Sequence, residues 1–170
     1  MTKTYFLTLL VALLAITSGI SQKYGYINST ELLIGMPQVK EADSQLEAYQ
    51  KQLLSKGESM VKAFETEYTK YAQEAQGGQL TGLQMQQREA DLGKKQQEIR
   101  LYEQEVQQKM ITKREELYKP ILDKVKAIVE QIGKDGGYTM IFDQAVSGAI
   151  VYGTESDNIM SQVKAKLGVQ

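Results

Sequence analysis

The feature that most constrains this chain is a pair of long, proline-free segments, the first of which carries a narrow apolar stripe. In that first segment, residues 39–76, ten apolar or small residues give nine steps over 33 residues, or about 3.7 residues per step. This period is helical and matches an 11-residue repeat, which produces a straight or slightly right-handed contact stripe. Because polar residues fill the remaining positions, the segment is predicted to be one long amphipathic helix with a stripe wide enough for one neighbour. The stripe consists of Ala42, Leu46, Tyr49, Leu53, Gly57, Met60, Phe64, Tyr68, Tyr71 and Ala75.

Residues 77–80 are predicted to form a tight turn that sends the chain back along this helix. The first helix ends at Gln76-Gly77-Gly78, since glycine is common just past a helix C-terminus. Thr81 and Gln84 have the spacing of a capping box, and Leu80 and Met85 that of a hydrophobic staple. Together these signals predict an antiparallel helical hairpin.

The return helix is predicted to run from residue 82 to residue 132, with an interruption and kink at Pro120. Residues 82–119 are therefore expected to pair with residues 39–76, while residues 121–132 belong to another part of the fold. The apolar stripe of the return helix is formed by Met85, Leu92, Ile99, Tyr102, Val106, Met110, Leu117, Ile121, Val125, Ile128 and Ile132.

Three short strands are expected around the hairpin. Residues 23–28 are aromatic and β-branched, residues 138–143 alternate and then become continuously apolar, and residues 149–152 are predicted to pair with 138–143 as a hairpin. Asn28 is expected to start a short helix with Glu31 completing its capping box. A last helix is expected to be capped by Asp157 or Ser156 and to end at Gly168. The apolar face of that helix would be Ile159, Met160, Val163 and Leu167.

These elements predict an α+β fold: a small β-containing body with a long inserted α-helical hairpin. The body would comprise residues 22–36 and 120–170, and the hairpin arm residues 37–119. A sheet of about three short strands is marginal on its own, and one copy would leave sheet edges exposed. We therefore expect a homo-oligomer in which strands pair between chains, a core formed within one chain being the alternative. Candidate oligomerisation residues are Tyr26, Ile27, Ile141, Phe142, Ile150 and Val151.

Residues 1–21 have the pattern of a cleaved secretory signal peptide. Lys3 gives a positive start, the apolar run 5–16 is broken only by Thr8, and Gly19 and Ser21 are the small residues of a cleavage site. A membrane anchor is the alternative, but about 12 apolar residues are too few to cross about 30 Å of hydrocarbon. We therefore predict export from the cytosol and no stable membrane insertion after cleavage.

The composition excludes most enzyme chemistry. The chain has no Cys and no His, so disulfides, thiolate nucleophiles, His-ligated metals and Ser-His-Asp triads are impossible. A formal net charge of −1, from 20 Lys+Arg against 21 Asp+Glu, argues against nucleic-acid binding. Residues 133–137 lack the spacing of a phosphate loop. Asp143 and Asp157 could pair as two carboxylates, but the sequence places no other catalytic residues with them. We therefore predict a protein that is not an enzyme and has no cofactor and no metal site.

The far half of the hairpin is expected to bind flexible partners. Residues 75–87 carry no charge, and residues 73–108 include 11 Gln. Such a weakly apolar surface suits unfolded and variable partners, because Met and Tyr adapt to different apolar shapes. Candidate binding residues at the tip are Leu80, Leu83 and Met85. Further candidates, for which hairpin packing is the simpler role, are Phe64, Tyr68, Tyr71 and Leu92.

Weak motifs follow one another along the chain in a recognisable order. They are a Lys-x-Gly-Tyr-Ile-Asn strand, a Met-Pro-x-x-Lys-x-Ala helix start, Pro120-Ile121, Gly137-Tyr138-x-x-Ile141-x-Asp143, Val151-Tyr152 and Lys166-Leu167-Gly168 at the end of an Asp157-led helix. This order resembles the Skp/OmpH family of periplasmic chaperones. The resemblance covers the whole mature chain, and its specificity lies in order and spacing rather than in one motif.

The resemblance implies a periplasmic homotrimer in which strands of three chains build the body and three hairpins surround a cavity. It implies an ATP-independent holdase that binds unfolded outer-membrane β-barrel proteins. The well-known members are strongly basic, whereas here residues 39–76 carry 5 positive and 7 negative charges and residues 82–118 carry 7 of each. A lipopolysaccharide site is therefore not expected. The alternative function is a non-catalytic coiled-coil adaptor or structural protein of the cell envelope, which would favour a rigid tip with charges or aromatic residues.

Overall fold

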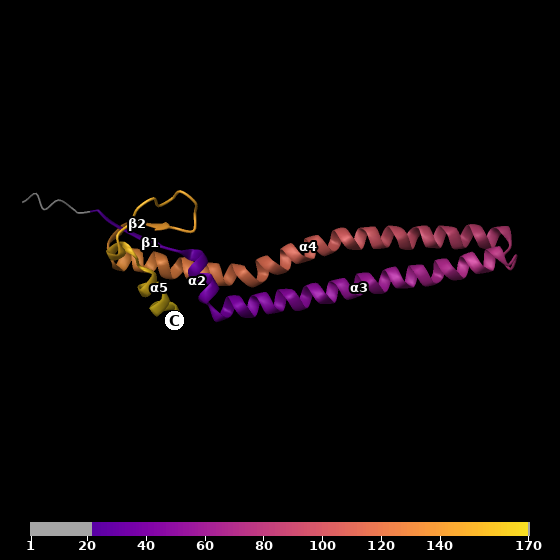
Figure 1. The fold of residues 1–170 in the computed structure, drawn as a ribbon, viewed down its shortest axis with the longest axis horizontal. Helices are drawn as coiled ribbons and strands as arrows, with labels where there is room; N and C mark the ends of the chain where they lie inside the picture. The colour runs from indigo at the N-terminus through magenta and orange to yellow at the C-terminus, as the bar shows by residue number, and fades with distance from the viewer. Residues whose placement is uncertain (1–21, 170) are drawn as a thin grey trace, which may run out of the picture. The chain divides into compact units, whose positions relative to one another are not determined.

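The computed structural model describes residues 22–169, so the expected signal peptide at residues 1–21 lies outside the described residues. Within this range long helices accompany a small sheet of two strands, which confirms the α+β class (Figure 1). The elements are β1 (Lys23–Ile27), α2 (Ser29–Gly35), α3 (Pro37–Gln76), α4 (Gly82–Asp135), β2 (Tyr138–Asp143), a 3₁₀ turn η1 (Glu155–Asp157) and α5 (Met160–Leu167). They form two compact units. The body unit contains the described residues up to 30 and residues 127–168, and the hairpin unit contains residues 31–126.

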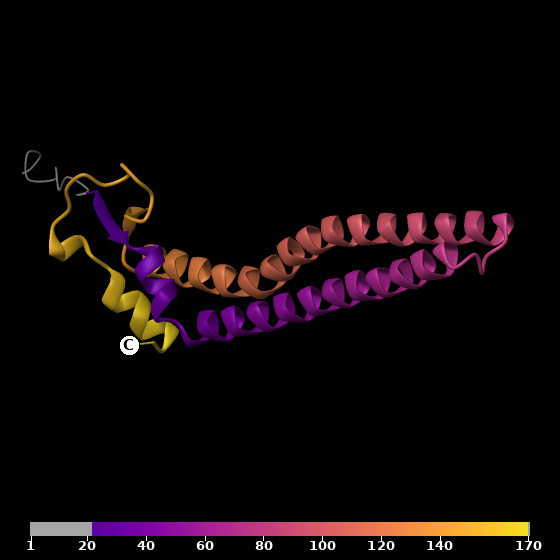
Figure 2. The same cartoon turned by 45° about the vertical axis from the view of Figure 1, so that its right-hand side comes forward.

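In the hairpin unit, α3 and α4 lie side by side along most of α3, as two views of the chain show (Figures 1 and 2). Pro37 occupies the first turn of α3, where its missing N–H leaves no bond unmade. Ala42, Leu46 and Leu53 are buried, whereas Tyr68 near the far end is 55% exposed. The predicted stripe is thus confirmed near the start of α3, and it becomes thinner towards the tip.

The turn between α3 and α4 has the predicted chemistry. The N–H of Gln84 donates to Oγ1 of Thr81 at 3.3 Å, and the N–H of Thr81 donates to Oε1 of Gln84 at 2.8 Å. This reciprocal pair completes the capping box and satisfies two backbone donors at the start of α4. Gly78 has a φ of 66°, a left-handed conformation that glycine adopts without a steric cost.

Pro120 does not interrupt the return helix, and this prediction is corrected. Helix α4 runs from Gly82 to Asp135 with Pro120 inside it. A proline removes one helical N–H and leaves the carbonyl four residues earlier without its usual partner. Ile121 and Val125 on the following turn are only 9% and 7% exposed. Their burial keeps this part of the chain helical despite the lost hydrogen bond.

The sheet of the body unit joins two strands from distant parts of the sequence. β1 and β2 are parallel, with Tyr24 opposite Met140, Tyr26 opposite Phe142 and a register shift between residues 23 and 24. The other edge of β1 forms a single parallel bridge from Tyr26 to Asn158. Both predicted strands at residues 23–28 and 138–143 are therefore confirmed, within one residue at their ends.

The third predicted strand, at residues 149–152, is absent from the described chain. After β2 the backbone turns, with the N–H of Val146 bonded to the Asp143 carbonyl at 3.2 Å, and Gly148 has a φ of 79°. Val151 and Tyr152 are 96% and 85% exposed. The expected hairpin is wrong because β2 pairs with β1, and residues 149–152 have no neighbouring strand within one chain. A strand-like sequence does not form a strand when no partner strand lies beside it.

The last helix begins later than predicted. α5 starts at Met160, whose N–H is capped by Oδ1 of Asn158 at 3.0 Å. Asp157 instead closes the preceding 3₁₀ turn, where Oδ2 accepts a hydrogen bond from Oγ1 of Thr154 at 2.8 Å. The predicted end at Gly168 is confirmed by a φ of 71°. The predicted apolar face is also confirmed, since its members are all buried: Ile159, Met160, Val163 and Leu167.

Within the body unit, Asp143 links the end of β2 to Ser29. Its Oδ1 accepts hydrogen bonds at 3.0 Å from the N–H of Ser29, at the start of α2, and at 3.0 Å from the N–H of Ala145. Burial opposes ionisation of this carboxyl, but the hydrogen bonds from Ser29 and Ala145 outweigh it and lower its pKa. The end of β2 therefore caps a helix that precedes it by more than one hundred residues.

Candidate functional site on the helical hairpin

Side-chain contacts that use a carboxylate join α3 to α4 at intervals along the hairpin. They are Asp43 with Tyr118, Glu67 with Lys95, Tyr71 with Glu89 and Glu74 with Arg88. The Tyr71 hydroxyl donates to Glu89 at 2.6 Å, and this hydrogen bond raises the pKa of the Tyr71 phenol. Exposed contacts of this kind contribute little to stability, because water screens them. The far part of the hairpin is therefore held by weak polar contacts as much as by apolar packing.

Tyr102 fixes the middle of the hairpin. It is 5% exposed, and its hydroxyl donates to the Leu53 carbonyl at 2.9 Å. A Cβ added to Gly57 would lie 3.5 Å from the Tyr102 ring, so the ring lies directly against the glycine. The ammonium group of Lys56 is 5.0 Å from the ring centroid, within the range of a cation–π contact. The Tyr102 side chain of α4 thus packs directly against α3 near Leu53 and Gly57.

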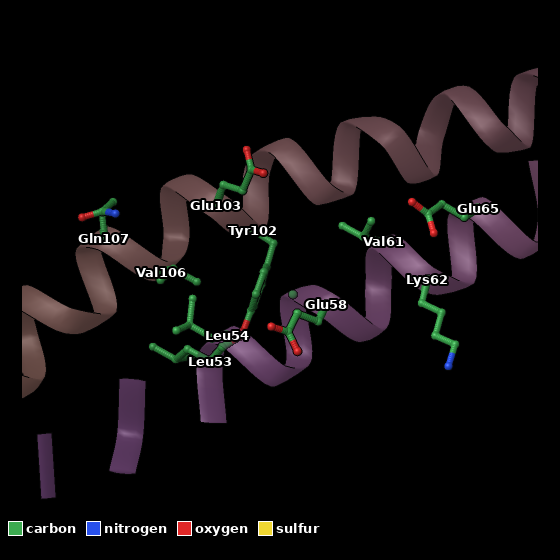
Figure 3. Close-up of a pocket in the computed structure, with 11 residues that line it drawn as sticks. Leu53, Leu54, Glu58, Val61, Lys62, Glu65, Tyr102, Glu103, Val106 and Gln107 are labelled. Atoms are coloured by element: carbon green, nitrogen blue, oxygen red, sulfur yellow. The ribbon is translucent and has the colours of Figure 1, made fainter. Parts of the chain in front are cut away.

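Beside Tyr102 the two helices leave an open, largely apolar groove of about 610 Å³ (Figure 3). Figure 3 shows Tyr102 reaching from α4 towards Leu53 and Leu54 of α3. The apolar lining is Leu53, Leu54, Val61, Tyr102 and Val106, and the polar lining includes Glu58, Lys62, Glu65, Glu103 and Gln107. Leu54 and Val61 remain 53% and 39% exposed. The groove can accommodate apolar side chains of a partner.

Sequence reasoning missed this groove although a signal was present. Leu54, Val61 and Tyr68 are seven residues apart, so they share one face of α3, next to the predicted stripe. Only the stripe that contacts α4 was recognised. The second row was overlooked because one of its three members, Tyr68, had already been assigned to that stripe. A wider apolar face than one neighbour needs is the mark of a surface that can take a further partner.

The structure separates the predicted binding residues by exposure. Leu83 at the tip is 78% exposed, and Tyr68 is exposed while stacking on Phe64 with ring centroids 6.2 Å apart. Leu92 is buried between the helices. The remaining candidates are half-buried: Leu80, Met85, Phe64 and Tyr71. The candidates are distributed along the hairpin and are not gathered in one pocket.

The predicted oligomerisation residues lie in the body unit and also differ in exposure. Ile27 is buried, Phe142 is 39% exposed and Val151 is 96% exposed. The other three, Tyr26, Ile141 and Ile150, are half-buried. A shallow hollow of about 420 Å³ is lined by Tyr24, Tyr26, Phe142 and residues 149–153. Tyr24 and Phe142 contact each other across it, with ring centroids 6.2 Å apart.

Residues 22–169 lack the features of two other kinds of site. In that range no three acidic side chains are grouped so that they could hold a metal ion. No helix of the described chain is both long enough and apolar enough to cross a bilayer. What the hairpin offers to a partner is apolar and amide surface.

Comparison with known proteins identifies the family. The family described as "Outer membrane protein (OmpH-like)" matches residues 23–167, which contain every described helix and strand. This chain belongs to the OmpH-like family. The resemblance inferred from the order of motifs is therefore confirmed.

A solved structure shares the OmpH-like fold of this chain. It is that of a candidate outer membrane chaperone (OmpH-like) from Caulobacter crescentus CB15, with a TM-score of 0.73 and 14% sequence identity. The match covers 86% of this chain and 83% of that one. At this identity the likeness establishes a common fold. None of the curated proteins matches this OmpH-like sequence.

Proposed function

We propose that this OmpH-like chain is an ATP-independent holdase chaperone that binds unfolded outer-membrane β-barrel proteins and prevents their aggregation. The observation that carries the proposal is the exposed, uncharged tip of the hairpin, where Leu83 is 78% exposed. The tip combines exposed Leu83 with half-buried Leu80 and Met85 in a segment without charge, and a group of apolar residues on a surface is typical of a binding site. The family match and the structural neighbour, a candidate chaperone, support the same role.

The construction of the hairpin suits a variable partner. Weak polar contacts such as Tyr71 with Glu89 hold its far part, so small changes in the separation of the helices cost little. Residues 75–87 carry no charge, so binding does not depend on the charge of the partner. Both properties fit the binding of many unfolded chains better than the binding of one folded partner.

We further propose that the body unit mediates self-association, with a homotrimer as the expected state. Val151 and Tyr152, 96% and 85% exposed, belong to a strand-like segment without a partner strand in one chain. Pairing of this segment with another copy would bury both side chains. In this proposal, residues 22–36 and 120–170 act as the oligomerisation body and residues 37–119 as the arm. Export through a cleaved signal peptide at residues 1–21 would place the trimer in the periplasm.

The test is an aggregation assay without ATP. An unfolded β-barrel outer-membrane protein is diluted from urea with and without the purified chain, and light scattering is followed. The chain is expected to suppress scattering, and a double variant, Leu83→Ser with Met85→Ser, is expected to suppress it less. A matched control replaces two exposed residues of the arm that lie away from the tip and outside the proposed oligomerisation body, Gln50→Ser with Gln52→Ser.

Two outcomes would contradict the proposal. Unchanged scattering in the presence of the wild-type chain would remove the holdase function. Capture of one stoichiometric folded protein in a pull-down, without denatured membrane proteins, would favour the envelope adaptor instead. Sedimentation at micromolar concentration tests self-association separately, and a stable monomer would contradict the role of the body.

A further inference from the structure

One face of α4 carries an exposed row of uncharged residues, here called the amide stripe. Its members follow one another at steps of three or four residues, so they share one side of the helix. Each of them is exposed. The members are Leu83, Gln86, Ala90, Gly93, Gln97, Leu101, Gln104, Gln108 and Ile111. The 28-residue separation of its ends corresponds to about 42 Å of helix.

The absence of charge from the amide stripe is a local property of this face. Ten of the other 20 residues between positions 83 and 111 are charged, whereas none of the nine stripe residues is. The exposed face of α3 that carries Glu47 and Lys51 differs, since these two residues form an ion pair at 2.8 Å. A face that only had to be soluble would carry charges, as that of α3 does. The stripe therefore fits a partner surface that is itself uncharged.

Gly93, near the middle of the amide stripe, has no packing role within the described chain. A Cβ added to Gly93 would meet no atom within 4 Å. A glycine inside a helix lowers helix stability relative to alanine. With Ala90 one turn before it, this glycine leaves the helix backbone open to close approach by another backbone.

The glutamines of the stripe are available to a partner. Among residues 22–169, the side-chain amides of Gln86, Gln97, Gln104 and Gln108 make no hydrogen bond to another residue. Each amide can donate and accept, which are the two needs of a peptide group in an extended chain. Uncharged amides thus complement the uncharged backbone of any polypeptide, whatever its side chains. Leu83, Leu101 and Ile111 add apolar contacts between them.

We propose that the amide stripe of α4 binds an extended segment of unfolded polypeptide by its backbone. This inference rests on the proposed holdase function and names the surface and the chemical group recognised. A stripe of about 42 Å matches about 13 residues of extended chain at about 3.3 Å per residue. Recognition of peptide groups explains how one surface binds chains of different sequence, and it requires neither a charge pattern nor a pocket for a particular side chain.

The experiment compares the wild-type chain with a quadruple variant in which Gln86, Gln97, Gln104 and Gln108 are replaced by Met. Methionine keeps the length and the helix propensity of glutamine but removes the amide. A matched control replaces four exposed glutamines of α3 that do not form one continuous row, namely Gln50, Gln52, Gln73 and Gln76, by Met. The affinity of each protein for a fluorescently labelled, urea-diluted β-barrel protein is measured by anisotropy, together with its sedimentation.

The quadruple α4 variant is expected to bind at least about tenfold more weakly, as the loss of two or more net hydrogen bonds implies. The α3 control should bind as the wild type does. Gly93→Leu should also weaken binding, because its side chain would cover the open helix backbone at a position where an added Cβ meets no atom within 4 Å. A wild-type chain that binds while both α4 variants bind equally well or more tightly overturns the inference and leaves the holdase function standing.

Two other outcomes also decide the matter. A changed oligomeric state of the α4 variants with unchanged affinity would show that the stripe contacts a second copy of the chain, and would overturn the inference. A wild-type chain that fails to bind any unfolded protein would remove the proposed function and the inference together.

A peptide with alternate N-methylated amides is expected to compete poorly, and equal competition by its unmethylated and methylated forms would contradict backbone recognition.

Discussion

Replacement of Asp143 tests whether one carboxylate couples the sheet to α2. Oδ1 of Asp143 accepts hydrogen bonds from the N–H of Ser29 and of Ala145, each at 3.0 Å. Asp143→Ala removes both acceptors. Loss of a helix cap costs about 1 kcal/mol, and a second hydrogen bond to a partly exposed carboxylate adds about another 1 kcal/mol. The expected loss in the free energy of unfolding is therefore about 1–2 kcal/mol, and about half of that for Asp143→Asn, which keeps an acceptor oxygen.

The sign of the pH dependence follows from the pKa of Asp143. Burial alone would raise it, but the hydrogen bonds from Ser29 and Ala145 leave it lowered in the folded chain. A carboxyl whose folded pKa is depressed stabilises the fold above its unfolded pKa of about 3.9, and this contribution is lost as pH falls through the folded pKa. The difference between wild type and Asp143→Ala should therefore be full at pH 7 and should shrink below about pH 4.

The measurement is urea unfolding followed by circular dichroism at pH 7 and at about pH 2.5. Protein concentration is held equal in all samples, because self-association would otherwise shift the midpoint. Equal midpoints for wild type and Asp143→Ala at pH 7 would refute the coupling. A difference that persisted unchanged at low pH would refute the assignment of the effect to the ionised carboxylate.

Further changes test the hairpin. Gly57→Ala should stabilise it by about 0.5–1 kcal/mol and raise the Tm by a few degrees, because the new Cβ lies at an ordinary 3.5 Å from the Tyr102 ring; a lower Tm in a circular dichroism melt would contradict this. Tyr102→Phe should cost about 1 kcal/mol in urea unfolding, since it removes the hydrogen bond to the Leu53 carbonyl, and an unchanged midpoint would count against that role. Thr81→Ala should cost about 1 kcal/mol and speed amide hydrogen exchange at Gln84, whereas unchanged exchange there would argue against the cap.

Local rules predicted the hairpin well because its elements are fixed by neighbouring residues. The start of α3 at Pro37, the capping box of Thr81 and Gln84 and the end of α5 at Gly168 each depend on a few adjacent positions. The expected strand at residues 149–152 failed for the opposite reason. A strand needs a partner, and the position of β1 beside β2 is set by residues far away in the sequence.

The candidate surfaces were harder to predict than the helices. Leu83 was recognised because it lies in an uncharged segment with glycines around it. The groove beside Tyr102 was missed because Leu54 and Val61 extend a stripe that already had a partner. The amide stripe was missed because glutamine scores as an ordinary polar residue in a search for apolar periodicity. The spacing of its nine residues can be read in the sequence, and the structure adds that every one of them is exposed.

The parallel pairing of β1 with β2 has a consequence for the order of folding. The two strands are separated by the whole hairpin, so β1 leaves the ribosome long before its partner exists. The hairpin itself depends on contacts that are near in sequence at its turn and can close progressively from Thr81 and Gln84. Once the contact between Asp43 and Tyr118 has formed, only short segments separate it from the two strands. The loss of chain entropy when β1 pairs with β2 is then small. We therefore expect the arm to fold first and the sheet to close last.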